Sequence, residues 1–230
     1  MREITTVLSD QAYLECPRWH EDRIWVSDFY THEVLSALED GSDRRVEAEV
    51  PGQPSGLGWL PDGRLLVVSQ HDSRVLRREP DRSLVTHADL SAQIPGEPND
   101  MVVDRHGRAF VGSFGFDLFG GAPVAPTSVH RVDPDGTVTR VADDLWFPNG
   151  GGALWIADAL AGRVLRVREG GEVLEEIAVG TGVFACMLGG HDGRTLFLCA
   201  APDFDRAARS AAREAELRAC RVDVPHAGRP

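Results

Sequence analysis

Three side chains with hard oxygen donors stand beside prolines at corresponding places in the sequence. Glu15 precedes a Cys-Pro pair, and Asn99 and Asn149 each follow a proline. A carboxylate and two amide carbonyls are donors that Ca²⁺ and Mg²⁺ prefer. Taken singly, each of these residues would be interpreted as a turn residue beside proline. The common register of Glu15 and Asn99 in a repeat, together with the same local Pro-Asn form at Asn149, favours the alternative, one divalent-metal site built by all three.

The register is measured from five short apolar runs that recur along the chain. The runs WVSD, VVSQ, FVGS, WIAD and LFLC end at Asp28, Gln70, Ser113, Asp158 and Cys199, at intervals of 42, 43, 45 and 41 residues. Glu15 lies 13 residues before the end of its run and Asn99 lies 14 before the end of its own. Ser55, 15 residues before, and Ala185, 14 before, hold the same place in two further repeats. The donors therefore recur at one point of the repeat.

The length of the repeat indicates the architecture. An interval of 41 to 45 residues is typical of a four-stranded propeller blade. Asp-Gly and His-Gly turns precede several runs, as antiparallel strands require. A further strand is expected after four of the runs, at Glu33–Leu38, Arg74–Arg78, Ser128–Val132 and Arg163–Arg168. The sequence predicts an all-β propeller, with residues 1–230 as a single domain.

Two segments depart from the repeat. Residues 114–128 form a stretch rich in glycine, proline and aromatic residues, and predict an inserted loop. Asp205–Leu217 has the alanine, arginine and glutamate content of a helix. Arg218–Val224 then predicts a closing strand.

Charge and targeting signals limit the possible functions. The net charge of −12 argues against nucleic-acid binding, because phosphates would be repelled over most of the surface. The first residues hold charges without an apolar signal region, and no run reaches about 18 apolar residues, the length of a membrane span. The four cysteines lack metal-type spacing and predict reduced thiols. We expect a cytoplasmic protein with no nucleic-acid or membrane partner, of open oligomeric state.

At these residues the sequence resembles the SMP-30/gluconolactonase/luciferin-regenerating-enzyme-like family. The motifs are Glu15-Cys16-Pro17-Arg18-Trp19, Glu97-Pro98-Asn99-Asp100 and Phe147-Pro148-Asn149-Gly150. The resemblance implies a six-bladed propeller that hydrolyses lactones with a divalent metal in its channel. It implies that Glu15 and Asn149 are metal ligands, and that Asn99 binds metal, substrate or metal-bound water. Asp117 is implied as a substrate contact. Asp100 is a further candidate for substrate contact and is the nearest carboxylate available to act as a base.

The sequence also departs from that family. Members that act on gluconolactone carry an arginine at the position of Glu97. The family's fourth motif supplies an aspartate that binds metal and acts as general base, and nothing here matches it. Pro134-Asp135-Gly136 precedes Asn149, which is the wrong order. The catalytic base is therefore unassigned.

The position of the missing motif can be located in the repeat. Asn149 lies only 9 residues before Asp158, and three glycines, Gly150–Gly152, occupy most of the expected first strand of this blade. We therefore predict a six-bladed type of propeller with five blade repeats visible and about one blade, carrying the aspartate, missing after Asn149.

These observations leave more than one function open. The first is a metal-dependent hydrolase that opens a small sugar lactone or similar cyclic ester, with Ca²⁺ expected and Mg²⁺, Zn²⁺ or Mn²⁺ open. The second is a non-catalytic propeller that binds a small ligand or a protein, and the third is a damaged chain without function. Serine-hydrolase chemistry is not indicated, because the sequence has no G-x-S-x-G motif.

Overall fold

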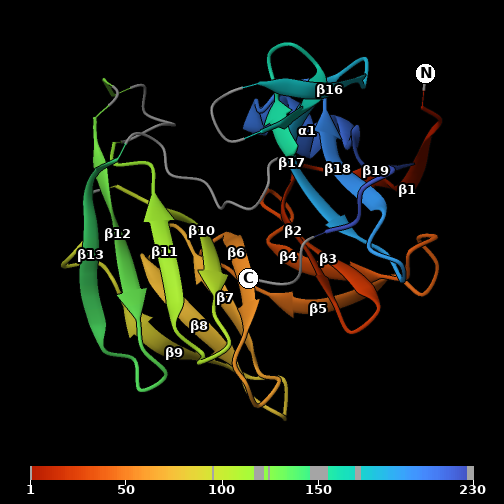
Figure 1. Cartoon of the computed structure of the whole chain (residues 1–230). Coiled ribbons are helices and arrows are strands. Elements are labelled where there is room, and N and C mark those ends of the chain that lie inside the picture. Colours follow the sequence, from red (N-terminus) through yellow and green to blue (C-terminus); the bar gives the residue numbers. More distant parts are fainter. Residues whose placement is uncertain are drawn as a thin grey trace. The chain divides into compact units, whose positions relative to one another are not determined.

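The computed structural model describes residues 2–94, 96–116, 122–123, 125–145, 155–168 and 172–226. These residues form five antiparallel sheets and one short helix (Figure 1). The chain divides into two compact units, which are described in turn. Unit 1 comprises Met1–Glu49 and Gly151–Arg229, and unit 2 comprises Val50–Gly150.

Unit 2 consists of two four-stranded meanders in which the strands follow their order in the sequence. The first contains β6 (Pro54–Trp59), β7 (Leu65–Ser69), β8 (Arg74–Arg78) and β9 (Leu84–Asp89). The second contains β10 (Pro98–Val103), β11 (Ala109–Ser113), β12 (Thr127–Val132) and β13 (Val138–Leu145). The first strands of the two meanders, β6 and β10, lie side by side. This is the strand pattern of propeller blades.

Two glycines of β6 allow this close approach. A Cβ atom on Gly56 would lie 2.5 Å from the backbone nitrogen of Met101. A Cβ atom on Gly58 would lie 2.3 Å from Cγ2 of Val103. Since residues i and i+2 of a strand face the same side, both glycines turn their bare face to β10. An apolar core that includes Leu66, Val68 and Met101 then forms between the sheets.

Unit 1 contains three sheets. The first is a meander of β2 (Leu14–His20), β3 (Arg23–Asp28), β4 (Glu33–Ala37) and β5 (Arg45–Glu49). The second has the order β17 (Gly182–Gly189), β18 (Thr195–Ala201), β19 (Ala215–Arg221) and β1 (Ile4–Gln11). The third consists, in the described residues, of β14 (Trp155–Asp158), β15 (Arg163–Val167) and β16 (Val173–Ala178).

The sheet that contains β1 joins the two ends of the sequence. Ile4 on β1 pairs with Cys220 on β19, and Thr5 pairs with Ala219. The predicted closing strand is confirmed in β19, although it begins three residues earlier than expected. The strand β1 was not expected from the sequence.

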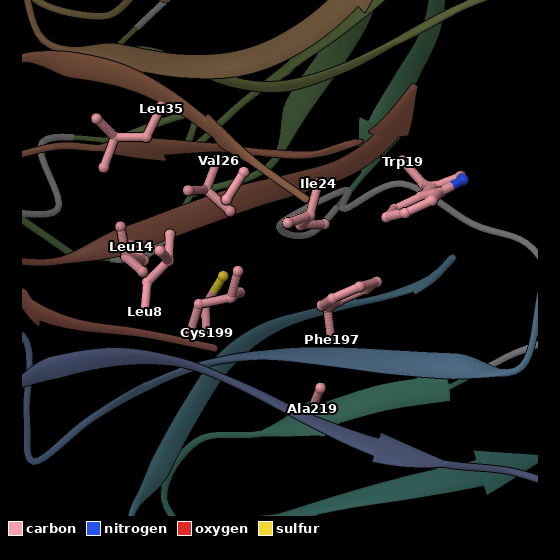
Figure 2. Packing of buried hydrophobic residues seen from close by; sticks show 11 residues of the cluster. Leu8, Leu14, Trp19, Ile24, Val26, Leu35, Phe197, Cys199 and Ala219 are labelled. Carbon is pink, nitrogen blue, oxygen red and sulfur yellow. The ribbon is translucent and has the colours of Figure 1, made fainter. Parts of the chain in front are cut away.

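The core of unit 1 lies between β2, β3, β18 and β19 (Figure 2). Ile24, Val26 and Phe197 are completely buried there. The rings of Trp19 and Phe197 stack with centroids 5.7 Å apart and planes inclined by 14°. Burying one such side chain stabilises the fold by roughly 1.5–3 kcal/mol.

The repeat predicted from the sequence is confirmed at the level of strands. The five apolar runs lie in β3, β7, β11, β14 and β18, with Gln70 directly after its strand. Four of these strands are second in their sheets, and β14 is the first described strand of its own. The strands expected after the runs are also present, as β4, β8, β12 and β15.

The helix is shorter than predicted. It covers Arg206–Ala212, with Asp205 as the N-cap accepting a hydrogen bond from the backbone of Ala208. Arg213 ends it in the left-handed conformation, at φ 51°. Ala215 and Leu217 are completely buried in β19, so burial in the sheet overrides the helical composition there. This is the only helix in the described part of the chain, and its seven residues are too few to cross a membrane.

The fold is therefore all-β, with five sheets of the blade type. The predicted sixth blade has no support in the described residues, which contain five blade sheets. The glycine tract at 150–152 and much of the predicted loop at 114–128 lie outside them.

Candidate functional site

Glu15 is placed by an irregularity at the start of β2. Its backbone pairs with Ser27, and the register then shifts before Arg18 pairs with Trp25. Cys16, inside this shift, has a φ of 51°, which is uncommon for a residue with a side chain. Irregularities of this kind turn a side chain away from the regular alternation of a strand.

Side chains of β17, of β18 and of the segment before β2 lie near the Glu15 carboxylate. Burial, with the charge of Glu15 as the second cause, raises the pKa of Cys186 on β17 to about 12. The same two causes raise the pKa values of Cys199 on β18 and Tyr13 well above their usual range. The backbone N–H of Cys16 donates to Oε2 of Glu15 at 3.3 Å. The carboxylate thus lies where β2, β17 and β18 come together within unit 1.

A buried aspartate fixes the chain that leads into β2. Asp28 is completely buried, and its Oδ2 accepts a hydrogen bond from the backbone of Ala12 at 2.9 Å. Its Oδ1 accepts one from the backbone of Tyr13 at 3.0 Å. The last residue of the first apolar run therefore positions the segment directly before Glu15.

The same irregularity recurs in both sheets of unit 2. Ser55 and Asn99 are the second residues of β6 and β10, as Glu15 is the second residue of β2. The register shifts after Pro54 in β6 and after Pro98 in β10. The common register predicted from the spacing is therefore present in three separate sheets.

Asn99 lies at the end of a chain of side-chain hydrogen bonds. Its Oδ1 accepts from Oγ of Ser55 at 2.9 Å and from Nε2 of Gln70 at 3.1 Å. Oε1 of Gln70 accepts in turn from Nε2 of Gln53 at 2.5 Å. An amide oxygen has two lone pairs, and both are used here. Asn99 therefore turns its N–H₂ group, and not its carbonyl oxygen, away from the chain.

A histidine and a carboxylate lie next to this chain. Nδ1 of His71 is 2.7 Å from Oε1 of Glu97, the residue that directly precedes β10. Oε2 of Glu97 is buried and has no hydrogen-bond partner among the described residues. Glu97, at which the sequence departs from the arginine implied by the family resemblance, is therefore paired with His71.

The remaining predicted site residues are placed less completely. Oδ1 of Asp100 accepts a hydrogen bond from the backbone of Met101 at 2.8 Å, so that oxygen stabilises its own strand. Asp117 and Asn149 lie outside the described residues. Their roles, and the joint metal site of Glu15, Asn99 and Asn149, stay predictions.

Some polar residues at the site were missed from the sequence. Gln70 entered only as the end of an apolar run, Gln53 was not singled out, and His71 was interpreted as a solvated histidine in a polar turn or at a strand edge. The available signal was chemical: in one repeat a glutamine replaces the aspartate or serine that ends other runs.

The described residues fit a metal only in part. They contain no group of three or more His, Cys, Asp or Glu side chains that could hold an ion. Glu15 supplies one carboxylate of the type that Ca²⁺ prefers. Asn99 does not fit as a ligand in this orientation, since its oxygen already accepts two hydrogen bonds. It fits a donor to an oxygen of a ligand.

Comparison with protein families matches residues 14–152, more than half of the chain, to the SMP-30/Gluconolactonase/LRE-like region. The chain belongs to this family. The matched segment begins one residue before Glu15 and contains Asn99 and Asn149. Comparison with curated proteins gives no match.

Solved structures support the fold of this family member. A luciferin-regenerating enzyme matches with a TM-score of 0.81 and 13% identity, covering 100% of this chain and 98% of that one. Regucalcin from Agrobacterium tumefaciens, a calcium-binding protein, matches with a TM-score of 0.77 and 16% identity, covering 100% and 96%. A gluconolactonase from Xanthomonas campestris matches with a TM-score of 0.72 and 18% identity, covering 96% of this chain and 90% of that one. At these identities the likeness concerns the fold.

Proposed function

We propose that this protein is a metal-dependent hydrolase that opens a small sugar lactone or a similar cyclic ester. One observation carries the proposal within a family that includes gluconolactonases. Glu15 and Asn99 occupy the second position of the first strand of their sheets, each at a shift of register. An irregularity that turns a polar side chain at one point of a repeat is typical of a functional site.

The proposal gives each residue a role. Glu15 and Asn149 hold the cation, for which Ca²⁺ is the first candidate and Mg²⁺, Mn²⁺ and Zn²⁺ are alternatives. Asn99, Asp117 and Asp100 contact the substrate. When bound, the cation would polarise the lactone carbonyl and lower the pKa of a water molecule. No residue is assigned as the general base.

The test combines turnover with metal binding. Ring opening of a panel of sugar and aliphatic lactones is followed by acid release, with the protein treated with a chelator and then reloaded with each cation. Glu15→Gln keeps the shape of the side chain and removes its charge. We expect at least a tenfold loss of Ca²⁺ affinity by calorimetry, whereas Glu3→Gln, an exposed control in the same unit, leaves the affinity unchanged. Equal affinities in wild type and Glu15→Gln would remove Glu15 from the site.

A non-catalytic binding propeller is the second candidate. It is favoured by the lack of any counterpart to the family's metal-binding aspartate in this sequence. Calcium binding without turnover of any lactone would select it.

We also propose that the active protein contains a further blade between Asn149 and Ala153, which supplies that aspartate. The short interval from Asn149 to Asp158 supports this proposal. Ile156 on β14 is 44% exposed, although it belongs to an apolar run. Intact mass of the active protein is the test. Full metal-dependent activity at 25.1 kDa, the mass of this chain, would show that no further blade is required.

A further inference from the structure

We infer that Gln70 is a positioning residue, which with Gln53 and Ser55 holds the Asn99 amide so that its N–H₂ group faces the ligand. Asn99 is then a hydrogen-bond donor to substrate oxygen and not a metal ligand. This inference rests on the proposed function for its catalytic part. Its structural part, the orientation of the amide, is independent of any activity.

The chain of hydrogen bonds connects the two sheets of unit 2. Gln53 and Gln70 lie next to the ends of β6 and β7, and Asn99 belongs to β10. Ser55 reaches the same Oδ1 atom from β6. Because β6 and β10 lie side by side, the chain fixes Asn99 from the neighbouring sheet as well as from its own backbone.

Burial gives the chain its rigidity. Gln53, Ser55 and Gln70 are all completely buried, whereas Asn99 is only half-buried. Buried amides are tolerated when they are hydrogen-bonded, and one without a partner is costly. Rotating the Asn99 amide by itself would set its N–H₂ group against the N–H₂ group of Gln70, although the Ser55 hydroxyl can accept as well as donate. The orientation of Asn99 is therefore coupled to that of Gln70 and, through Gln70, to that of Gln53.

The orientation decides what Asn99 can bind. Among the described residues, Nδ2 of Asn99 makes no hydrogen bond. Of the four hydrogen-bonded side chains, that of Asn99 is the one that is only half-buried. A preorganised N–H donor stabilises negative charge that develops on a carbonyl oxygen. During hydrolysis water adds to the carbonyl carbon, the ring C–O bond breaks, and the released alkoxide takes up the proton that water loses. Asn99 donates a hydrogen bond throughout and neither gains nor loses a proton.

The orientation is tested first on the wild-type protein by NMR. Side-chain amide exchange is measured after ¹⁵N labelling, with Asn99→Asp and Gln70→Met used to assign the signals. We expect protected amide protons on Gln53 and Gln70 and rapidly exchanging ones on Asn99. Protected Asn99 amide protons in the wild type would overturn the inference, whether or not the protein is a lactonase.

Two substitutions then separate a donor from a metal ligand. Asn99→Asp keeps both accepted hydrogen bonds and removes the N–H₂ group. We expect a fall in kcat of about 10²–10³-fold, as for other lost oxyanion donors, with unchanged or tighter Ca²⁺ binding. A weaker Ca²⁺ affinity with preserved kcat would overturn the inference. If no lactone is turned over by the wild type, the proposed function fails, and the amide exchange still tests the orientation.

Gln70 is tested by two variants and a control. Gln70→Met removes the hydrogen bonds at similar length, and we expect kcat to fall at least tenfold while KM and Ca²⁺ affinity change less than threefold. Gln70→Glu can only accept, so it should reverse Asn99 and protect its amide protons. Ser69→Ala, a buried neighbour outside the chain, should leave kcat unchanged. Wild-type kcat in Gln70→Met together with unaltered Asn99 exchange would show that Gln70 has no positioning role.

Discussion

Gly56 on β6 lies directly against the backbone of Met101 on β10, where a Cβ atom would stand 2.5 Å from the Met101 nitrogen. The same Cβ atom would be 3.0 Å from the backbone oxygen of Asn99. The backbone of β10, the strand that carries Asn99, therefore packs directly against a glycine of the neighbouring sheet. Ser55, the residue before Gly56, is at the same time a hydrogen-bond donor to Asn99.

Gly56→Ala is expected to displace β10, because the atoms that the new methyl group would meet belong to the backbone. Overpacking of this kind costs about 1–3 kcal/mol. We expect a lower midpoint of chemical denaturation and a loss of kcat from displacement of Asn99.

Gly58→Ala provides the matched control for that variant. Its methyl group would meet the Val103 side chain, so Val103→Ala should relieve the clash. The same second substitution should not rescue Gly56→Ala. If Val103→Ala rescued both variants equally, backbone contact would not be the reason for Gly56.

Phe197→Ala is expected to destabilise the protein by about 3–5 kcal/mol. The ring is completely buried and stacks on Trp19 (Figure 2). Trp19 in turn lies close against Gly189. Denaturation followed by circular dichroism measures the change. Leu160→Ala, at a side chain that is 97% exposed, should change stability by less than about 0.5 kcal/mol. A cost at Phe197 no larger than at Leu160 would contradict the assigned core.

Local sequence signals were sufficient to predict the repeating strands and the common register of Glu15, Ser55 and Asn99. They depend on turns and apolar runs, which act within a few residues. The strand β1 could not be found in this way, because its partner β19 lies more than 200 residues away and half of its own residues are exposed.

The contacts around Asn99 were unpredictable for a similar reason. Gln53 and Gln70 meet because β6 and β7 pair, and Asn99 joins them only when two sheets come together. The spacing predicted that Asn99 belongs to a site. It could not indicate which end of the amide is free, and this decides between a metal ligand and a donor.

The cysteine thiols are expected to react slowly in the folded protein. Burial raises the pKa of Cys186 to about 12 and that of Cys220 to about 11, and raises the pKa of Cys199 well above its usual range. The thiolate is the reactive form, so little of it exists at pH 8. Titration with an aromatic disulfide should modify all four cysteines in guanidinium chloride, and at least tenfold more slowly in buffer. Rapid native reaction at Cys199 would contradict its burial.

Unit 2 is expected to lose stability on mild acidification because of His130. Its side chain is 1% exposed, and burial followed by the charge of Arg140 lowers its pKa, against a smaller opposing effect of Asp143. The unfolded chain then binds more protons than the folded one below about pH 6.5, the ordinary value for histidine. The contribution of neutral, buried His130 to the free energy of unfolding is complete above that pH. It decreases as the pH falls toward the pKa of His130 in the folded protein, by at most about 1.4 kcal/mol per pH unit. Denaturation between pH 5.5 and 7.5 should give a shallower pH dependence for His130→Phe than for wild type. His106→Ala, at an exposed histidine, should retain the wild-type slope, and identical slopes for all three proteins would show that His130 is not held neutral by burial.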